Sequence, residues 1–343
     1  MRYLTLGISA SIGMLITLAV LPTSSSRDRT LAGNEKDNFM AQRPVPDVLY
    51  GVTLENVEGL SQTKRAAIVD SLEHFHSRPA VRIVFDFART PNASNYKVLA
   101  SEVWPKASAV LGEILDSAGV NQCDLACYGE RTTAYLDSLD DHVDIWEVGN
   151  EVNGNWLRPH KNSSNADVID QESKDVAEKI YAATKLVKDR KGRTALTVYY
   201  NENCWKFPQD EMFSWTEAYL LKYLEKQHPD FKLNNNLNYV LISYYEDDCN
   251  DLQPDWPKVF GRLAELFPNS KIGFGECGAK KKPLKQEQYL RRYYVEHQQT
   301  LRQIFPEKYV GGYFWWYFKR DMVPRIKNGK INPLWGIFDG VIQ

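Results

Sequence analysis

Residues 143–156 read Val143-Asp-Ile-Trp-Glu-Val-Gly-Asn-Glu-Val-Asn-Gly-Asn-Trp156 and decide the fold. The stretch begins as an apolar strand and reaches Asn150 and Glu151, after which Gly, Asn and Trp residues end the β pattern. A carboxylate at the end of a buried strand is costly unless it is hydrogen-bonded or used. A second stretch of the same design, Lys271-Ile-Gly-Phe-Gly-Glu-Cys277, ends in Glu276. We therefore predict that Glu151 and Glu276 work together at the ends of two strands.

Runs of strand length and helical patterns alternate along the rest of the chain. Besides the opening stretch, the predicted strands span 48–53, 80–86, 107–111, 195–200, 239–245, 271–277 and 311–318. Eight such units predict an α/β protein with a (β/α)₈ TIM barrel rather than an open doubly wound sheet. Neither a Gly-rich dinucleotide fingerprint nor a phosphate loop is present, which also disfavours the open sheet. In a TIM barrel, catalytic groups lie at the C-terminal ends of the strands, where both glutamates are placed.

The composition is that of a globular protein. The chain has 343 residues, 43% hydrophobic and 25% charged, with a net charge of −2. Its longest basic block, Lys280-Lys-Lys282, is too short to indicate a nucleic-acid partner.

The N-terminal segment predicts export. An apolar run from Leu4 to Leu21 follows Met1-Arg-Tyr3, so residues 1–25 are interpreted as a signal peptide or a retained signal anchor. Residues 26–43 form a polar linker, and residues 44–343 form a single barrel domain. The expected location is secreted, periplasmic or otherwise extracytoplasmic, with a membrane-anchored protein facing outside as the alternative.

The five cysteines suit an oxidising compartment. One or two disulfides and one unpaired thiol are expected among Cys123, Cys127, Cys204, Cys249 and Cys277. Cys204 and Cys249 follow neighbouring predicted strands, so a bridge between their loops is possible.

No metal site is predicted. Cys123 and Cys127 have a spacing found in zinc sites, but no second Cys or His pair accompanies them. His74 and His76 fall in the last turn of a predicted helix, where their side chains point in different directions.

Two carboxyl groups are what hydrolysis of a glycosidic bond requires. The runs Trp146-Glu-Val-Gly-Asn-Glu151 and Gly275-Glu276, with a Trp-rich last strand, resemble the clan A retaining glycoside hydrolases. The resemblance implies that Glu151 is the acid/base, that Glu276 is the nucleophile, and that Asn150 binds the sugar hydroxyl beside the anomeric carbon. The implied activity is double-displacement cleavage of a β-linked oligo- or polysaccharide. It requires no metal or organic cofactor.

The same resemblance extends to aromatic residues at two later strand ends. It implies that a Tyr after strand six binds the nucleophile; Tyr245 is the first choice and Tyr244 the second. It also implies that Trp316 lies beneath the reacting sugar. Because alternate strand residues point to opposite sides, its neighbour Trp315 is expected to be structural.

Four further residues are candidates on physical grounds. Arg82, on the second strand, is a donor that would keep the nucleophile ionised, unless it belongs to the barrel floor. Glu147 has the same strand parity as Glu151 and is expected to be a structural partner of Arg82. Trp156 either extends the substrate cleft or packs as part of a lid, and Trp205 has the same two interpretations.

Two alternatives to hydrolysis stay open. A barrel that binds glycan without cleaving it would keep the aromatic cleft while the two carboxyl groups were misplaced. A transglycosylase would use the same residues, with a second sugar replacing water. Mannan, glucan, galactan and xylan all stay open as substrates, and so do endo and exo action.

Overall fold

The computed structural model describes residues 43–87, 92–202, 204, 210–280 and 285–343. The predicted signal or anchor over 1–25, the predicted linker up to residue 42, and Trp205 lie outside these ranges. Within them, no helix combines the length and the apolar character that a membrane crossing requires.

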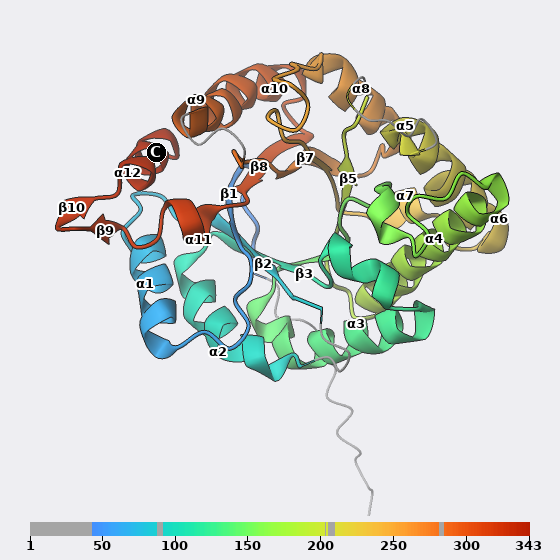
Figure 1. The fold of residues 1–343 in the computed structure, drawn as a ribbon, viewed down its shortest axis with the longest axis horizontal. Coiled ribbons are helices and arrows are strands. Elements are labelled where there is room, and N and C mark those ends of the chain that lie inside the picture. Colours follow the sequence, from blue (N-terminus) through green and yellow to red (C-terminus); the bar gives the residue numbers. More distant parts are fainter. Residues whose placement is uncertain (1–42, 88–91, 203, 205–209, 281–284) are drawn as a thin grey trace, which may run out of the picture. The chain divides into compact units, whose positions relative to one another are not determined.

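Eight parallel strands form a closed barrel in chain order, with β8 hydrogen-bonded to β1. Helices surround the barrel on its outer side (Figure 1). The strands are β1 Leu49–Leu54, β2 Ala80–Val84, β3 Ala109–Glu113, β4 Ile145–Gly149, β5 Thr194–Tyr199, β6 Tyr239–Ser243, β7 Lys271–Glu276 and β8 Tyr309–Trp315. The predicted (β/α)₈ TIM barrel is confirmed.

Most helices lie between consecutive strands, and the last few follow β8. The α-helices are α1 Gln62–Glu73, α2 Ser94–Val103, α3 Leu125–Leu139, α4 Ala166–Asp189, α5 Met212–Trp215, α6 Leu224–Gln227, α7 Leu233–Asn236, α8 Trp256–Leu266, α9 Gln286–Arg291, α10 Gln298–Ile304, α11 Phe318–Asp321 and α12 Pro333–Val341. Short 3₁₀ segments are η1 Trp104–Lys106, η2 Ser117–Gln122, η3 Asp140–His142 and η4 Asn155–Leu157, and two π-helical segments are η6 Thr216–Tyr223 and η8 Arg292–His297. A two-stranded hairpin, β9 Ile326–Lys327 and β10 Lys330–Ile331, precedes α12.

Two strand boundaries differ from the predicted ones in ways that affect the site. The third strand was predicted at 107–111, but β3 begins at Ala109 and continues to Glu113. The continuation was not predicted because Gly112 lies within it, and a glycine inside a run of strand length weakens the prediction of a strand. The last strand was predicted to reach Phe318, but β8 ends at Trp315, which leaves Trp316 in the loop that follows.

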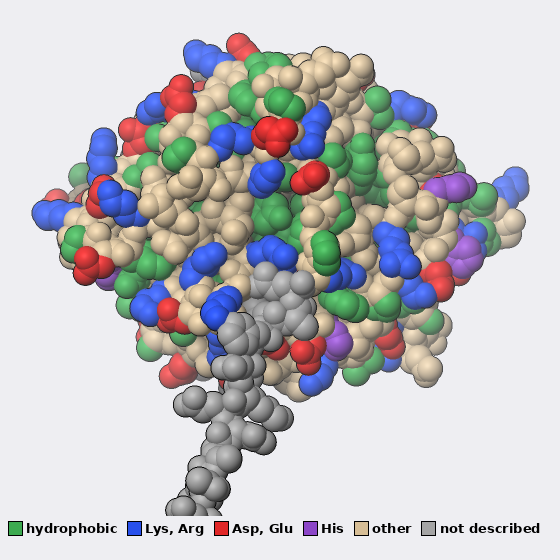
Figure 2. All heavy atoms as spheres, turned by 180° about the vertical axis from the view of Figure 1, so that it is seen from behind, with side chains coloured by type: hydrophobic (Ala, Val, Ile, Leu, Met, Phe, Trp, Pro, Cys, Tyr) green, Lys and Arg blue, Asp and Glu red, His purple; other side chains and the backbone are tan. Residues whose placement is uncertain are grey.

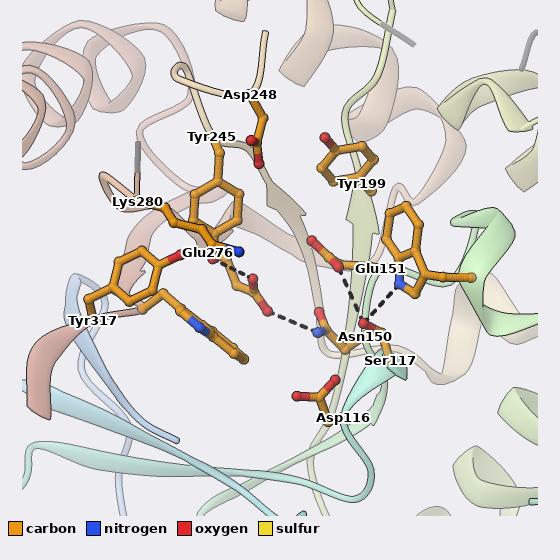
Figure 3. A pocket seen from close by; sticks show the side chains of 12 residues that line it. Asp116, Ser117, Asn150, Glu151, Tyr199, Tyr245, Asp248, Glu276, Lys280 and Tyr317 are labelled. Carbon is orange, nitrogen blue, oxygen red and sulfur yellow. Dashed lines mark hydrogen bonds between the residues drawn. The ribbon is translucent and has the colours of Figure 1, made fainter. Parts of the chain in front are cut away.

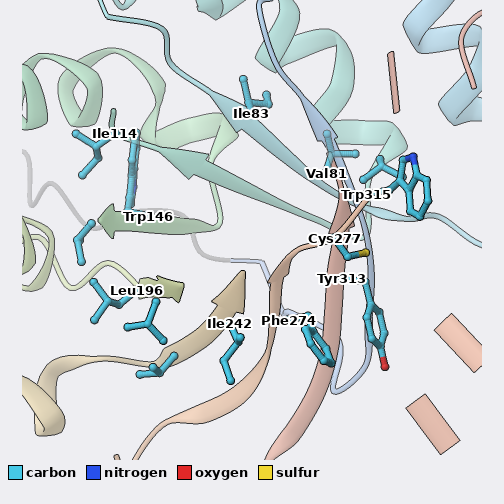
Figure 4. Packing of buried hydrophobic residues seen from close by; sticks show 14 of the residues in the cluster. Val81, Ile83, Ile114, Trp146, Leu196, Ile242, Phe274, Cys277, Tyr313 and Trp315 are labelled. Atoms are coloured by element: carbon cyan, nitrogen blue, oxygen red, sulfur yellow. The ribbon is translucent and has the colours of Figure 1, made fainter. Parts of the chain in front are cut away.

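Strand residues alternate between two cores. Residues such as Val81, Ile83 and Trp146 point outward (Figure 4). They belong to a core that also contains apolar residues of the surrounding helices. Inward-pointing residues form a second, smaller core inside the barrel, made of Leu49, Ala80, Ala109, Leu111, Ile145, Ala195, Tyr239, Leu241, Val310 and Phe314. Nearer the C-terminal strand ends, the inward positions become polar, and this change creates the candidate site.

Two disulfides join the predicted cysteines. Cys204 pairs with Cys249 and Cys123 pairs with Cys127, while Cys277 is a buried free thiol. The bridge between the loops after β5 and β6 agrees with the prediction, and the zinc-like spacing of Cys123 and Cys127 belongs to a disulfide. Positive and negative side chains are interspersed over the face in Figure 2, in keeping with the small net charge.

Candidate active site

Glu151 lies two residues beyond the end of β4. Its φ angle of 49° is in the left-handed region, which non-glycine residues adopt infrequently and which is often associated with functional sites. Two serine hydroxyls contact its carboxyl: Ser243 Oγ lies 2.6 Å from Oε1, and Ser117 Oγ lies 3.3 Å from Oε2. The backbone conformation and these two hydroxyls fix the position of the carboxyl group.

Glu276 is the last residue of β7, and its carboxyl receives hydrogen bonds on both oxygens. Oε1 accepts from Arg82 Nη1 at 2.7 Å and from Asn150 Nδ2 at 2.9 Å. Oε2 accepts from the Tyr245 hydroxyl at 2.8 Å, and Ser243 Oγ lies 3.4 Å away. Burial raises the pKa of Tyr245 well above its usual value, so this phenol stays a donor. The donors together stabilise negative charge on Glu276.

The two carboxyl groups face the same small space (Figure 3). Because Ser243 Oγ contacts both, the sum of its two distances limits the separation between Glu151 Oε1 and Glu276 Oε2 to about 6 Å. Desolvation and the negative charge of Glu276 raise the pKa of Glu151 well above its usual value. The pair therefore consists of one carboxyl rich in donors and one that favours its protonated form.

A buried ionic layer lies beneath Glu276. Arg82 donates from Nε to Glu147 at 2.6 Å, and its Nη2 lies 2.9 Å from Glu113 Oε2. The predicted pairing of Arg82 with Glu147 is confirmed, and Thr197 also donates to Glu147. Gly275 is required here because a Cβ at that position would lie 2.6 Å from Thr197 Oγ1.

This layer holds more carboxyl groups than cations. One guanidinium serves Glu113, Glu147 and Glu276, and Arg82, Glu113 and Glu147 have no exposed side-chain surface. Desolvation raises the pKa of Glu113 well above its usual value and also raises the pKa of Glu147, against the opposing effect of Arg82. Burial therefore disfavours negative charge on these two neighbours of Glu276.

The pocket above the two glutamates has a volume of about 360 Å³. Its described lining residues are Asp116, Ser117, Asn150, Glu151, Trp156, Tyr199, Tyr245, Asp248, Glu276, Lys280, Trp316 and Tyr317. Aromatic rings and a few convergent polar groups are typical of a small-molecule site, and this size is within the usual range for one.

Two tryptophans that were candidates to contact the substrate line the pocket. Trp316 lines it and lies 5.4 Å from the Arg82 guanidinium, measured to the ring centroid. Trp156 packs edge-on against Tyr199 with 5.3 Å between the ring centroids and donates from its indole nitrogen to Ser117 Oγ at 3.0 Å. Trp315 is fully buried, as expected for the structural member of the adjacent pair.

The structure gathers most, but not all, of the predicted residues. Glu151, Glu276, Asn150, Tyr245, Trp316 and Trp156 line the pocket, and Arg82 lies directly beneath Glu276. Tyr244 is different: its ring is buried between neighbouring aromatics and its hydroxyl donates to the Leu252 carbonyl oxygen at 2.6 Å. Tyr244 therefore belongs to the packing, because successive residues after β6 point in opposite directions.

Sequence reasoning missed several residues of the site, among them Glu113, which pairs with Arg82, and Ser117, Ser243 and Tyr199, which contact Glu151 or line the pocket. Three of these four are strand-terminal residues of β3, β5 and β6, and Ser117 follows β3 closely. Their common signal was available, because each lies at or just beyond the C-terminal end of a barrel strand.

Among the described residues, no three His, Cys, Asp or Glu side chains are placed to hold a metal ion.

No protein-family model matches the sequence, and neither does any curated protein. Solved structures do match. A β-glucosidase from Thermotoga maritima in complex with galacto-hydroximolactam has a TM-score of 0.58 and 11% identity, with 88% of this chain and 98% of that chain covered. A family 1 β-glucosidase from the same organism has a TM-score of 0.53 and 12% identity, over 80% of this chain and 88% of that chain.

A β-glucosidase from Exiguobacterium marinum has a TM-score of 0.50 and 12% identity, covering 80% of this chain and 90% of that chain. The chain has the barrel fold of these enzymes. At this identity the likeness concerns the fold, and it confirms the predicted resemblance to clan A barrels at that level.

Proposed function

We propose that this chain is a retaining glycoside hydrolase that cleaves β-linked glycans. The main observation behind the proposal is the distance between the carboxyl groups of Glu151, after β4, and Glu276, on β7. Both contact Ser243 Oγ, so Glu151 Oε1 and Glu276 Oε2 lie within about 6 Å of each other. Retaining enzymes place the two groups about 5 to 5.5 Å apart, whereas inverting enzymes leave about 6.5 to 9.5 Å for a water molecule.

In the first step, the Glu276 carboxylate attacks the anomeric carbon and the bond from that carbon to the glycosidic oxygen breaks. Glu151 gives its proton to the departing oxygen, and the sugar is left as an ester on Glu276. The raised pKa of Glu151 suits this role, because an ordinary carboxyl would already be ionised at neutral pH.

In the second step, Glu151 acts as the base. It takes a proton from a water molecule, and the oxygen of that water attacks the anomeric carbon. The bond between this carbon and Glu276 breaks, and its electron pair returns to the Glu276 carboxylate. A sugar hydroxyl in place of water would give transglycosylation by the same residues.

Several groups are available to hold the sugar. Asn150 Oδ1 is buried and has no hydrogen-bond partner in the part of the chain that the structure describes, so it can accept from a sugar hydroxyl. Trp316 offers an indole face for the apolar side of a pyranose. Since the similar folds belong to β-glucosidases, β-glucosides are the first substrates to test.

We also propose that the protein is exported. The apolar segment within residues 1–25 is the main support, and the two disulfides agree with an oxidising compartment. Fractionation of cells that produce the full chain tests this location.

Azide rescue distinguishes the two glutamates. Dinitrophenyl β-glycosides of several sugars are given to the wild-type protein and to the Glu151→Ala and Glu276→Ala variants. Their leaving group departs without protonation, so Glu151→Ala should still form the glycosyl ester and should release it to azide as the β-glycosyl azide. Glu276→Ala should lose activity by about four orders of magnitude and, with azide, should give the α-glycosyl azide.

The anomeric configuration of the two azides decides the assignment. The same anomer from both variants, or full activity in Glu276→Ala, would contradict the proposed roles. Glycan binding by the wild type without turnover of any substrate would favour a non-catalytic glycan-binding barrel.

A further inference from the structure

Ser243 lies between the two glutamates. It is the last residue of β6, is fully buried, and contacts Glu151 Oε1 at 2.6 Å and Glu276 Oε2 at 3.4 Å. The proposed mechanism gives this residue no role. Its hydroxyl is nevertheless within reach of both the proposed acid and the proposed nucleophile.

A serine hydroxyl carries one hydrogen, so it donates to one carboxyl at a time. Ser117, the other serine at Glu151, is placed differently. Its Oγ accepts from the Trp156 indole, which directs its own hydrogen to Glu151 Oε2. Ser117 therefore serves one glutamate, whereas Ser243 can serve either.

We propose that the Ser243 hydroxyl is a charge-following switch, whose hydrogen points to whichever of Glu276 and Glu151 carries the negative charge. This proposal rests on the proposed glycosidase function, because the charge moves between these residues only during that reaction. Before the reaction Glu276 is anionic and Glu151 holds its proton, so the hydrogen points to Glu276. In the glycosyl ester Glu276 is neutral and Glu151 is anionic, so the hydroxyl turns to Glu151.

Other charged or titratable groups surround the pair and act on it throughout. From β2, β3, β4 and the loop after β3 these are Arg82, Glu113, Glu147 and Asp116. From β5 and the loops after β6, β7 and β8 they are Tyr199, Tyr245, Asp248, Lys280 and Tyr317. None of them is altered by substitution of a serine, so a serine variant isolates the hydroxyl.

The switch makes an unusual prediction for titration of the free enzyme. The pair ionises in two steps with macroscopic midpoints. Ser243 donates to no anion before the first step, to one anion after it, and still to only one after the second. Its removal should therefore raise the lower midpoint by about one pH unit and leave the upper midpoint in place.

Ser117→Ala is the matched control, because Ser117 donates only to Glu151. Its removal disfavours the second ionisation alone and should raise the upper midpoint by about one pH unit. The two alanine variants are expected to move opposite midpoints.

The test is a ¹³C NMR titration of protein labelled at the glutamate side-chain carboxyls. Glu151→Gln and Glu276→Gln assign the two resonances, and Ser243→Thr, which keeps a hydroxyl, should restore the wild-type midpoints. This titration needs no turnover, so it is informative even if the protein proves not to be a glycosidase. Equal movement of both midpoints in Ser243→Ala, or movement of the upper one alone, would overturn the switch.

A second arm uses the covalent intermediate. A dinitrophenyl 2-deoxy-2-fluoro-β-glucoside traps the ester on Glu276, after which only Glu151 of the pair titrates. Both Ser243→Ala and Ser117→Ala should then shift the acid limb of the reactivation rate upward by about one pH unit. An unshifted limb in Ser243→Ala would contradict the turn of the hydroxyl. A third outcome is that no ester forms although the two serine variants move opposite midpoints in the NMR titration. That outcome would contradict the proposed glycosidase function, but it would still support a Ser243 hydroxyl that serves either glutamate.

Discussion

The interior of the barrel has two halves with opposite chemistry, built from the same strands. The half nearer the N-terminal strand ends is filled by apolar side chains such as Ile145 and Leu111. Two residues further along the same strands, the inward positions hold Glu147 and Glu113 around Arg82. One barrel therefore separates its functions along the strand axis: the apolar half supplies packing, and the polar half holds charge.

The two halves contribute to stability differently. Apolar packing stabilises by removing surface from water, and it tolerates changes that keep volume. A buried ion pair contributes little net stability. Removal of one partner is nevertheless strongly destabilising, because the other charge stays buried without compensation. Substitutions in the two halves should therefore differ in size, in pH dependence and in their effect on catalysis.

The largest effect is expected from Arg82→Met. This change leaves Glu113, Glu147 and Glu276 without their shared cation. We expect a loss of about 3 to 5 kcal/mol in the free energy of unfolding at pH 7, measured by urea denaturation. Because desolvation raises the pKa of Glu113 and of Glu147, protonation of these two carboxyls should reduce the loss at pH 5. Hydrolysis of aryl β-glycosides should also fall, since Glu276 loses its closest donor.

Arg131→Met is the matched control for the charge effect. Arg131 is equally buried, but it donates to the carbonyl oxygens of Phe85, Asp86 and Ile114 rather than to carboxylates. Its destabilisation should not diminish between pH 7 and pH 5. The same pH dependence in both variants would show that the polar half is not distinguished by its charge.

A smaller effect is expected from Ile145→Ala in the apolar half. Ile145 is buried on β4, two residues before Glu147. Loss of its side chain should cost about 2 to 4 kcal/mol in unfolding free energy, independent of pH between 5 and 8. The turnover rate per folded molecule should stay within about twofold of wild type, because nothing in the pocket changes. A large fall in that rate would show that the two halves are mechanically coupled.

The apolar half of the barrel, and the strands that position Glu151 and Glu276, could be predicted well from the sequence. Hydrophobic periodicity located eight strands and the helices between most of them, because apolar side chains repeat with the period of each element. The positions of Glu151 and Glu276 followed from the same pattern, since a strand that ends in a carboxylate is unusual. Helix α2 was missed, as its sequence begins without a side-chain cap.

The polar half was harder to predict because its contacts join residues far apart in the chain. Ser243 acts between glutamates 92 and 33 positions away. Apart from its place at the C-terminal end of the strand, nothing in the local sequence of β6 distinguishes that serine from any other. Tyr245 was preferred to Tyr244, and the direction of each side chain at the end of β6 decides between them, because only the Tyr245 hydroxyl donates to Glu276. The pairing of Arg82 with Glu113 required the correct end of β3, which Gly112 obscured.

The smallest change in the free energy of unfolding is expected from Glu113→Gln near pH 4. This variant tests whether the buried Glu113 carboxyl is protonated in the folded protein. Desolvation raises the folded-state pKa of Glu113, so the unfolded chain releases this proton at a lower pH than the folded protein does. Above the unfolded-state pKa, the folded state binds more protons than the unfolded state, and wild-type stability falls as pH rises toward the folded-state pKa. Glutamine resembles the neutral acid in shape and does not ionise. The variant should therefore lie within about 1 kcal/mol of wild type near pH 4.

Its stability relative to wild type should then rise with pH, by up to about 1.4 kcal/mol per pH unit in that window. Urea denaturation from pH 4 to pH 8 measures the difference, and Glu307→Gln, a substitution at an exposed position, is the reference variant. A difference that stayed constant or fell with pH would mean that Glu113 is ionised in the folded protein. Arg82 would then balance three buried negative charges, and the polar half would depend on that one guanidinium more strongly than the Arg82→Met prediction assumes.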